Sequence, residues 1–254
     1  GRGDARDALA ELPYFLSLTP DHEHGFHTLG RQMLLAPARF AADGWFHVEA
    51  DDGAALPMPA RERAVAHGQT LSDDFQAPRL QPQWAFLAGG PGQLERVQVG
   101  AGALRLQASG SGPADSPPLG FIQGDPAFEL EFGLDFDEGV QAGVLLFYSP
   151  RLYAGLGVNA RALRLHRYGL DQRALPKPAG MARRLQLRLR CVRHVLTLFS
   201  RIDDRQPWVK FPVQMGVSGY HHNVAGGFMS LRPALYAAGA GEARFSDLRY
   251  RALP

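Results

Sequence analysis

Four consecutive residues form the segment of this sequence best suited to hold a sugar: Tyr220, His221, His222 and Asn223. Their imidazoles and amide could exchange hydrogen bonds with hydroxyl groups while the sugar ring lies against Tyr220. Adjacent histidines on a strand point to opposite faces, which argues against joint ligation of one metal ion. The alternative interpretation is a structural loop or the beginning of a strand.

Three aspartates could supply oxygen ligands to a cation. Asp73 and Asp74 lie at the start of a regular strand pattern and Asp247 lies near its end, so they would meet if the first and last strands pair. Carboxylate oxygens are the ligands that calcium takes in proteins. The sequence therefore accommodates a structural calcium at Asp74 and Asp247, and no other cofactor is predicted. Caps and turns explain the same residues.

Two further groups of residues could do chemistry but suit structural roles better. One is a polar, metal-capable turn: His22, Glu23, His24 and His27. It lacks a rigid spacing such as His-Glu-x-x-His, so we interpret it as a solvated turn. The other group could stack on sugar rings, but its alternating apolar neighbours favour core positions: Trp45, Trp84 and Trp208.

Composition excludes several classes of protein. The net charge is only +2 and the arginines are dispersed, unlike the clustered basic surface of a protein that binds nucleic acid or an anionic membrane. Cys191 is the single cysteine, which excludes an intramolecular disulfide and a thiolate zinc site. Arginine-rich, lysine-poor usage suggests a GC-rich bacterial genome. No signal peptide or bilayer-spanning run is visible, so we expect a cytoplasmic rather than a secreted location, with a signal upstream of Gly1 left open.

The elements that must position these residues are short strands. Apolar side chains alternate with polar ones in runs such as Leu104–Gln107, Phe128–Phe132 and Leu185–Leu189. Runs such as Val144–Tyr148 are continuously apolar, as expected for strands covered on both faces. With 29 glycines and 19 prolines to supply turns, roughly a dozen short strands predict an all-β protein with a two-sheet jelly roll.

The pattern divides the chain into three parts. Residues 1–50 contain two strand-like runs, Leu12–Leu18 and Met33–Phe40, which cannot bury a core alone. Residues 51–71 are rich in Asp, Gly, Pro and Ala without periodicity, which is typical of a linker. Residues 72–254 carry the regular strand pattern and are predicted to form the sandwich.

The order of several segments resembles glycoside hydrolase family 43, at the junction where a five-bladed catalytic propeller is followed by a concanavalin A-like β-sandwich. The matching segments are Gly1–Asp4, His27–Gln32, Ser72–Phe75 with Gln83 and Trp84, Leu146–Tyr148, Tyr153–Gly157, Trp208–Phe211, Ser218–Val224, Gly226–Tyr236 and Ala243–Tyr250. Residues 1–50 would then be the remnant of a propeller blade. Arg31 occupies the arginine of the family's Leu-Gly-Arg motif, so the resemblance implies that it contributes to a sugar subsite; pairing with a local acid is the alternative. Arg2 stands where the family has a histidine.

The resemblance implies an accessory C-terminal module. Family members hydrolyse terminal β-xylosides or α-L-arabinofuranosides with inversion of the anomeric centre. They use an aspartate base, a glutamate acid and a further aspartate. All three lie on earlier blades, so no catalytic residue is expected in this chain. The expected partners are the missing propeller domain or a catalytic subunit, and a xylo-oligosaccharide or arabinose-containing glycan derived from xylan. A free-standing carbohydrate-binding module and a non-enzymatic structural remnant are the alternatives.

Overall fold

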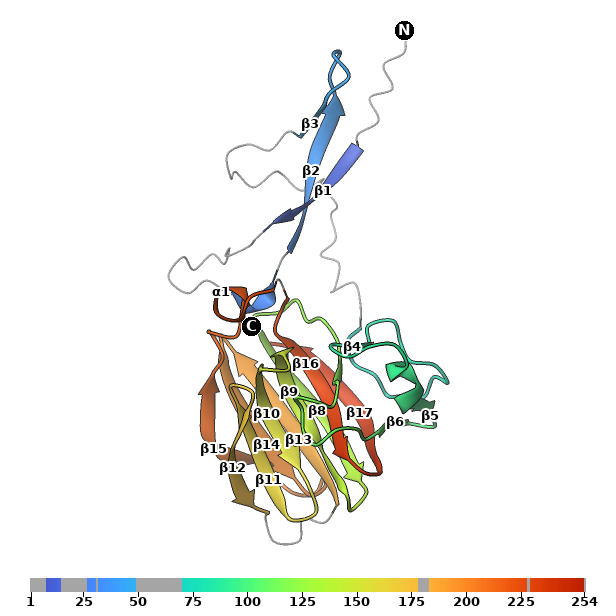
Figure 1. Ribbon diagram of the computed structural model, residues 1–254, viewed down its shortest axis with the longest axis vertical. Coiled ribbons are helices and arrows are strands. Elements are labelled where there is room, and N and C mark those ends of the chain that lie inside the picture. The colour runs from blue at the N-terminus through green and yellow to red at the C-terminus, as the bar shows by residue number, and fades with distance from the viewer. Residues whose placement is uncertain are drawn as a thin grey trace.

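The computed structural model describes residues 8–14, 27–30, 32–48, 70–177, 183–227 and 229–253, and its elements are almost all strands. A small antiparallel sheet comprises β1 (Ala8–Tyr14), β2 (Gln32–Phe40) and β3 (Phe46–Val48). Figure 1 shows it beyond one end of a larger sandwich. The first strand was predicted at Leu12–Leu18; β1 begins earlier because it pairs with β2 from Ala8 to Tyr14, and residues 15–18 lie outside the described part.

Two seven-stranded antiparallel sheets form the sandwich. The β9 sheet has the order β12-β11-β10-β9-β16-β7-β4. Its strands are β4 (Ala85–Phe86), β7 (Leu119–Gly120), β9 (Val140–Ser149), β10 (Leu152–Val158), β11 (Ala162–Arg167), β12 (Leu170–Pro176) and β16 (Arg232–Gly239). The β8 sheet has the order β15-β14-β13-β8-β17-β6-β5. Its strands are β5 (Val97–Gly100), β6 (Ala103–Gln107), β8 (Ala127–Phe136), β13 (Arg184–Val192), β14 (Val195–Arg201), β15 (Val209–Gly216) and β17 (Glu242–Ala252). The predicted all-β sandwich is confirmed.

Side-chain alternation explains which face of each strand is buried. In β13, Leu185, Leu187 and Leu189 enter the core between the sheets while the intervening residues face outward. In β9, both faces are buried, as its continuous apolar run predicts, because Leu145 and Phe147 form a second cluster on the outer face of the β9 sheet with Tyr153 and Tyr236. The outer faces of the two sheets therefore differ. At β13 the outer face of the β8 sheet is polar, whereas the outer face of the β9 sheet carries a buried apolar cluster.

The beginning of the sandwich is tied to its last strand. Asp73 forms a β-bridge with Leu248, and its carboxylate accepts hydrogen bonds from the Phe75 N–H at 2.8 Å and the Trp84 indole N–H at 2.9 Å. Trp84 is buried in the core, as predicted. Leu71, at the end of the predicted linker, is also buried in that core. Residues 49–69 of the linker lie outside the described part.

The strands create two ends that we call upper and lower, as they stand in Figure 1. The upper end comprises residues 121–126, 150–151, 168–169, 193–194 and 217–231, and carries the short helix α1 (His222–Ala225). The lower end comprises residues 137–139, 159–161, 202–208 and 240–241. Residues 229–231, directly before β16, are loop. Within the described part, no helix is long and apolar enough to cross a membrane.

Candidate functional site

Tyr220 anchors the upper end from inside. Its ring is fully buried and stacks on Tyr168 with 5.1 Å between ring centroids. Its hydroxyl oxygen accepts a hydrogen bond from the Tyr168 N–H at 2.8 Å. Burial raises the pKa of the Tyr220 hydroxyl, because the phenolate would lose its hydration. A sugar was expected to lie against the ring of Tyr220, but the protein encloses that ring.

The next three residues form a helical turn instead of the beginning of a strand. His221 caps α1, and its Nδ1 accepts a hydrogen bond from the Asn223 N–H at 3.2 Å. The rings of His221 and His222 meet edge to face at 5.9 Å, so the opposite-face geometry of a strand does not apply. Four residues are too few for helical periodicity to reveal the turn in the sequence. Both histidines are half-buried and Asn223 is exposed, and a sugar contact here stays a prediction.

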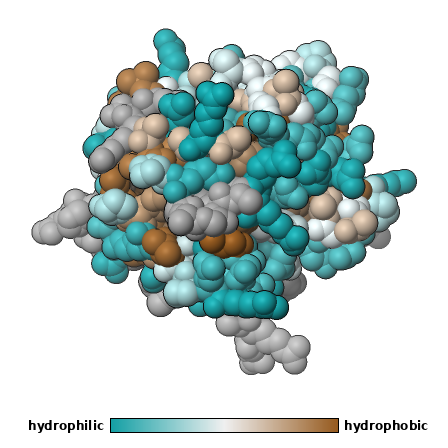
Figure 2. Space-filling view, turned by 90° about the horizontal axis from the view of Figure 1, so that it is seen from below, coloured by the Kyte–Doolittle hydropathy of each residue, from teal (hydrophilic) through white to brown (hydrophobic). Residues whose placement is uncertain are grey.

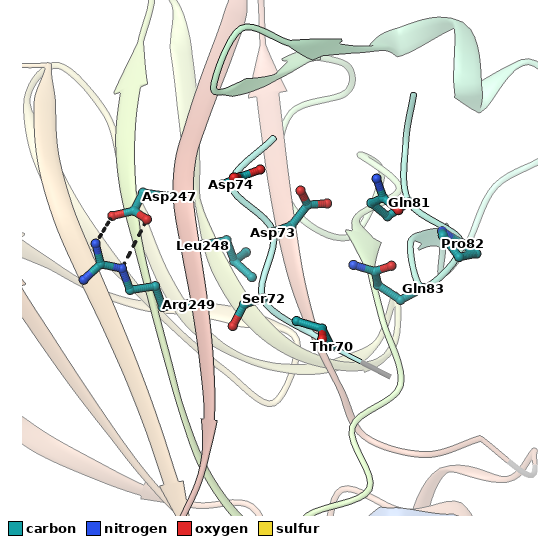
Figure 3. A pocket seen from close by; sticks show the side chains of 10 residues that line it. All are labelled: Thr70, Ser72, Asp73, Asp74, Gln81, Pro82, Gln83, Asp247, Leu248 and Arg249. Atoms are coloured by element: carbon teal, nitrogen blue, oxygen red, sulfur yellow. Dashed lines mark hydrogen bonds and ion pairs between the residues drawn. The ribbon is translucent and has the colours of Figure 1, made fainter. Parts of the chain in front are cut away.

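The structure brings Asp74 and Asp247 to one pocket. This pocket of about 600 Å³ lies between the start of the sandwich and β17. Figure 3 shows Asp247 turned toward Arg249 and away from Asp74. The guanidinium of Arg249 donates to both Asp247 oxygens, at 3.1 and 2.6 Å. Both aspartates thus line one pocket, and the ion pair between Asp247 and Arg249 was not predicted.

Each aspartate in this pocket already has protein donors. Asp74 accepts a hydrogen bond from the Gln76 N–H at 3.0 Å, and both oxygens of Asp73 are engaged by Phe75 and Trp84. The described residues contain no group of three or more His, Cys, Asp or Glu placed to hold a metal ion. A structural calcium at Asp74 and Asp247 stays a prediction.

The segment around the Leu-Gly-Arg motif lies against the upper end. His27 belongs to the 3₁₀ helix η1 (His27–Leu29), and the carbonyl of Thr28 accepts a hydrogen bond from the Leu231 N–H at 2.7 Å. Gly30 has a φ of 73°, and a Cβ atom there would lie 3.0 Å from Ser230. Glycine therefore suits this close approach. Arg31, His22, Glu23 and His24 lie outside the described residues.

Large apolar side chains are exposed at the upper end and at the first residues of the adjoining strands β12 and β14: Ile122, Tyr168, Leu170, Val195, Val224 and Met229. Figure 2, a view from below, shows mostly hydrophilic residues on the lower end. An exposed apolar surface rimmed by polar groups marks an interaction site in soluble proteins. The prediction of core positions for Trp45 and Trp208 is wrong: Trp45, in the turn between β2 and β3, is 72% exposed, and Trp208 is half-buried against Arg188. Phe40 is also exposed, whereas Phe147, Tyr153 and Tyr236 on the outer face of the β9 sheet are buried.

Sequence reasoning missed a buried arginine at the upper end. Arg232 begins β16 and is only 6% exposed. Within the described part, its Nε and Nη2 have no hydrogen-bond acceptor. Burial lowers the pKa of Arg232 from its ordinary value because it penalises the charged form. No signal in the sequence distinguishes this arginine from the many that are solvated.

Alternation in β13 places Arg188 on the outer face of the β8 sheet, but its side chain is only 21% exposed there. It is mostly buried, pairs with Glu131 at 2.6 Å and lies over the Trp208 ring at 4.3 Å. Glu129, which is almost fully buried, is paired with Arg251 at 2.7 Å. The basic side chains on this outer face are thus neutralised across the strands, and they do not form a groove for nucleic acid.

Comparisons with known proteins agree with this architecture. Residues 72–251 match the family described as "Beta xylosidase C-terminal Concanavalin A-like domain". A GH43 protein from Bacillus licheniformis is 20% identical, with a TM-score of 0.73, 91% of this chain covered and 49% of that chain. A xylan β-1,4-xylosidase from Bacillus halodurans is 19% identical, with a TM-score of 0.69 and coverages of 90% and 48%.

A GH43B protein from the xyloglucan locus of Bacteroides ovatus is 21% identical, with a TM-score of 0.71 and coverages of 88% and 48%. This chain therefore spans about half of the length of these solved structures. At such identities the likeness shows the fold alone. No curated protein sequence matches the chain. The match over residues 72–251 decides the family: this chain belongs to the β-xylosidase C-terminal concanavalin A-like domains of glycoside hydrolase family 43.

Proposed function

We propose that this chain is the accessory C-terminal module of a family 43 glycosidase and docks through its upper end onto a catalytic propeller. The propeller would be supplied by a longer polypeptide or by another subunit. The module would hold the propeller in place and help to close its substrate pocket. Residues 1–50 would belong to the last blade, residues 51–71 to the linker and residues 72–254 to the sandwich.

The apolar upper end is the observation that carries this proposal. Exposed aliphatic side chains such as Ile122 and Val224 lie on the same end as η1, which stands between β1 and β2 of the small sheet in the chain. Fully burying one such side chain contributes about 1.5–3 kcal/mol. Arg232 also lies at this end of the sandwich, and its buried Nε and Nη2 have no acceptor in the described part.

The names of similar proteins support the substrate class. One is described as a xylan β-1,4-xylosidase, and another is an engineered GH43 enzyme with endo-xylanase and exo-arabinofuranosidase activity. We infer that the parent reaction is inverting hydrolysis of terminal β-xylosides or α-L-arabinofuranosides in oligosaccharides from xylan. Inversion needs two carboxyl groups with room for water between them, and we assign that pair to the propeller.

Hydrolysis of p-nitrophenyl β-D-xyloside and α-L-arabinofuranoside by the purified 254-residue chain tests this function. We expect no turnover by the chain alone. Where its reading frame continues upstream, the longer polypeptide should hydrolyse at least one of the two substrates. Turnover by the 254-residue chain would place an acid and a base among its own residues and would overturn the accessory role.

A further inference from the structure

A second pocket lies at the lower end, on the outer face of the β9 sheet. It has a volume of about 360 Å³, within the range of small-molecule sites. Its polar lining comes from three separate stretches of chain: Ser111, Glu138, Gln141, Asn159, Arg161 and Arg164. This pocket is at the opposite end from the proposed docking surface, so a ligand here would not compete with the propeller.

Beside the pocket, glycines make room for the ring of Tyr236 on the outer face of the β9 sheet. Across the sheet, Tyr236 pairs with Gly143, which pairs with Gly157, which pairs with Arg164. A Cβ atom at Gly157 would lie 2.0 Å from the Tyr236 hydroxyl, so only glycine lets that ring extend across the strand. The hydroxyl is fixed by the Gln141 Nε2, which donates at 3.1 Å, and by the His166 Nε2 at 2.8 Å.

Two guanidinium groups line this pocket without a carboxylate partner in the described part. The Nε of Arg164 is buried and has no hydrogen-bond acceptor, and Arg161 is exposed. Glu138 also lines the pocket but makes no ion pair with either arginine within the described part. Arg188 is also half-buried and its Nε likewise has no acceptor, but its Nη2 pairs with Glu131. A buried N–H without an acceptor costs about 1–3 kcal/mol, and a ligand would contact Arg164 through its other guanidinium nitrogens, where the residue lines the pocket.

We propose that this pocket binds an acidic sugar, that is, a pyranose or furanose that carries a carboxylate. Guanidinium groups bind carboxylates with paired, charge-assisted hydrogen bonds. The oxygen of the Ser111 hydroxyl, which itself donates to Asp115 at 2.9 Å, and the amide oxygen of Gln141 would accept hydrogen bonds from the sugar hydroxyls. Asn159 would offer its amide N–H₂ alone, because its oxygen already accepts from the N–H groups of Arg161 and Ala162. The site goes beyond the proposed accessory role.

Calorimetric titration of the 254-residue chain with methyl β-D-glucuronoside tests the site. Methyl β-D-xyloside, acetate and inorganic phosphate are titrated in parallel to separate the contributions of the ring and the anion. We expect saturable binding of the glucuronoside, with the other three compounds at least about tenfold weaker. This test measures binding, whereas the accessory role is tested by hydrolysis. A failure of the pocket proposal can therefore be distinguished from a failure of the accessory role.

Three variants localise the binding. Arg164→Gln and Arg161→Gln should each weaken glucuronoside binding by about tenfold or more. Arg105→Gln removes the same charge from an exposed position on the β8 sheet and should leave binding unchanged. Thermal melting of each variant confirms folding, and Arg161, being exposed, provides a second variant if Arg164→Gln does not fold. No saturable binding, equal binding of acetate, phosphate or the xyloside, or unchanged affinity in both pocket variants would overturn the proposal.

Discussion

Arg232 is a charged residue in a buried environment. Its Nε and Nη2 are buried without an acceptor in the described part of the chain, a state in which a charged group destabilises the fold. We therefore expect Arg232→Met, which fills a similar volume, to raise the free energy of unfolding of the 254-residue chain by about 1–3 kcal/mol. Urea denaturation measures this change.

The matched control for that substitution is Arg188→Met. Arg188 is also mostly buried, but it pairs with Glu131 and stacks on Trp208, so its removal should destabilise the chain. A loss of stability in Arg232→Met comparable to that in Arg188→Met would show that Arg232 has a stabilising partner and would contradict the prediction.

Cys191 is predicted to be inert in the native state. Burial raises the pKa of its thiol to about 12, although the His194 N–H, which donates to the sulfur, acts in the opposite direction. Since the thiolate is the reactive form, almost none is present at pH 8. We expect a disulfide reagent such as Ellman's to label the native chain only on the timescale of unfolding. One equivalent should react at once in denaturant, and rapid labelling of the native chain would contradict this.

At the scale of the strands, Asp137 joins the end of β8 to the start of β17. Its carboxylate accepts from the Glu242 N–H at 2.9 Å and from Arg244 at 3.0 Å. These two hydrogen bonds hold the pKa of Asp137 below its usual value. A lowered pKa stabilises the fold above the unfolded pKa near 3.8, and this stabilisation is lost as the pH falls through the folded value.

Asp137→Asn should therefore lower the stability of the chain at pH 7 and have less effect in acid. Because the side chain is about half exposed, we expect a cost of only about 0.5–1 kcal/mol. Urea denaturation of both proteins at pH 7 and pH 2.5 measures the difference, which should shrink at the lower pH. A difference that stays constant with pH would assign the cost to something other than the carboxylate charge.

Strand patterning predicted most of the fold but not the partners of the arginines. The alternation of leucine and arginine in β13 predicted its buried face, and the pairing of the first and last strands brought Asp74 and Asp247 to one pocket. These features depend on local periodicity and on chain order.

Whether an arginine forms an ion pair depends instead on which residue the strand register places opposite it. Arg188 faces Glu131 across the strands and forms an ion pair. Arg164 faces Gly157 and Ala174, which offer no acceptor side chain. Arg232 faces Phe147. Since a shift of one residue would change every one of these pairs, the sequence did not reveal which arginines lack partners.

For the molecule as a whole, the two ends predict different behaviour. Without a docked partner, the apolar upper end should bind the dye ANS and promote self-association, whereas the mostly hydrophilic lower end should not. Replacing both Ile122 and Val224 with serine should then lower ANS fluorescence by about twofold and reduce association measured by sedimentation velocity.

Leu94→Ser is the matched control for this whole-molecule prediction. Leu94 is 65% exposed, as Val224 is, but it lies in η2 (Gln93–Arg96), away from the upper end. Its substitution should change neither the ANS fluorescence nor the association. In a longer polypeptide that contains the propeller, the Ile122→Ser, Val224→Ser variant should also lose thermal stability, because the same side chains would be buried by docking. Equal effects of the upper-end and Leu94 substitutions would show that apolar exposure in general, and not a docking surface at this end, governs the behaviour of the chain.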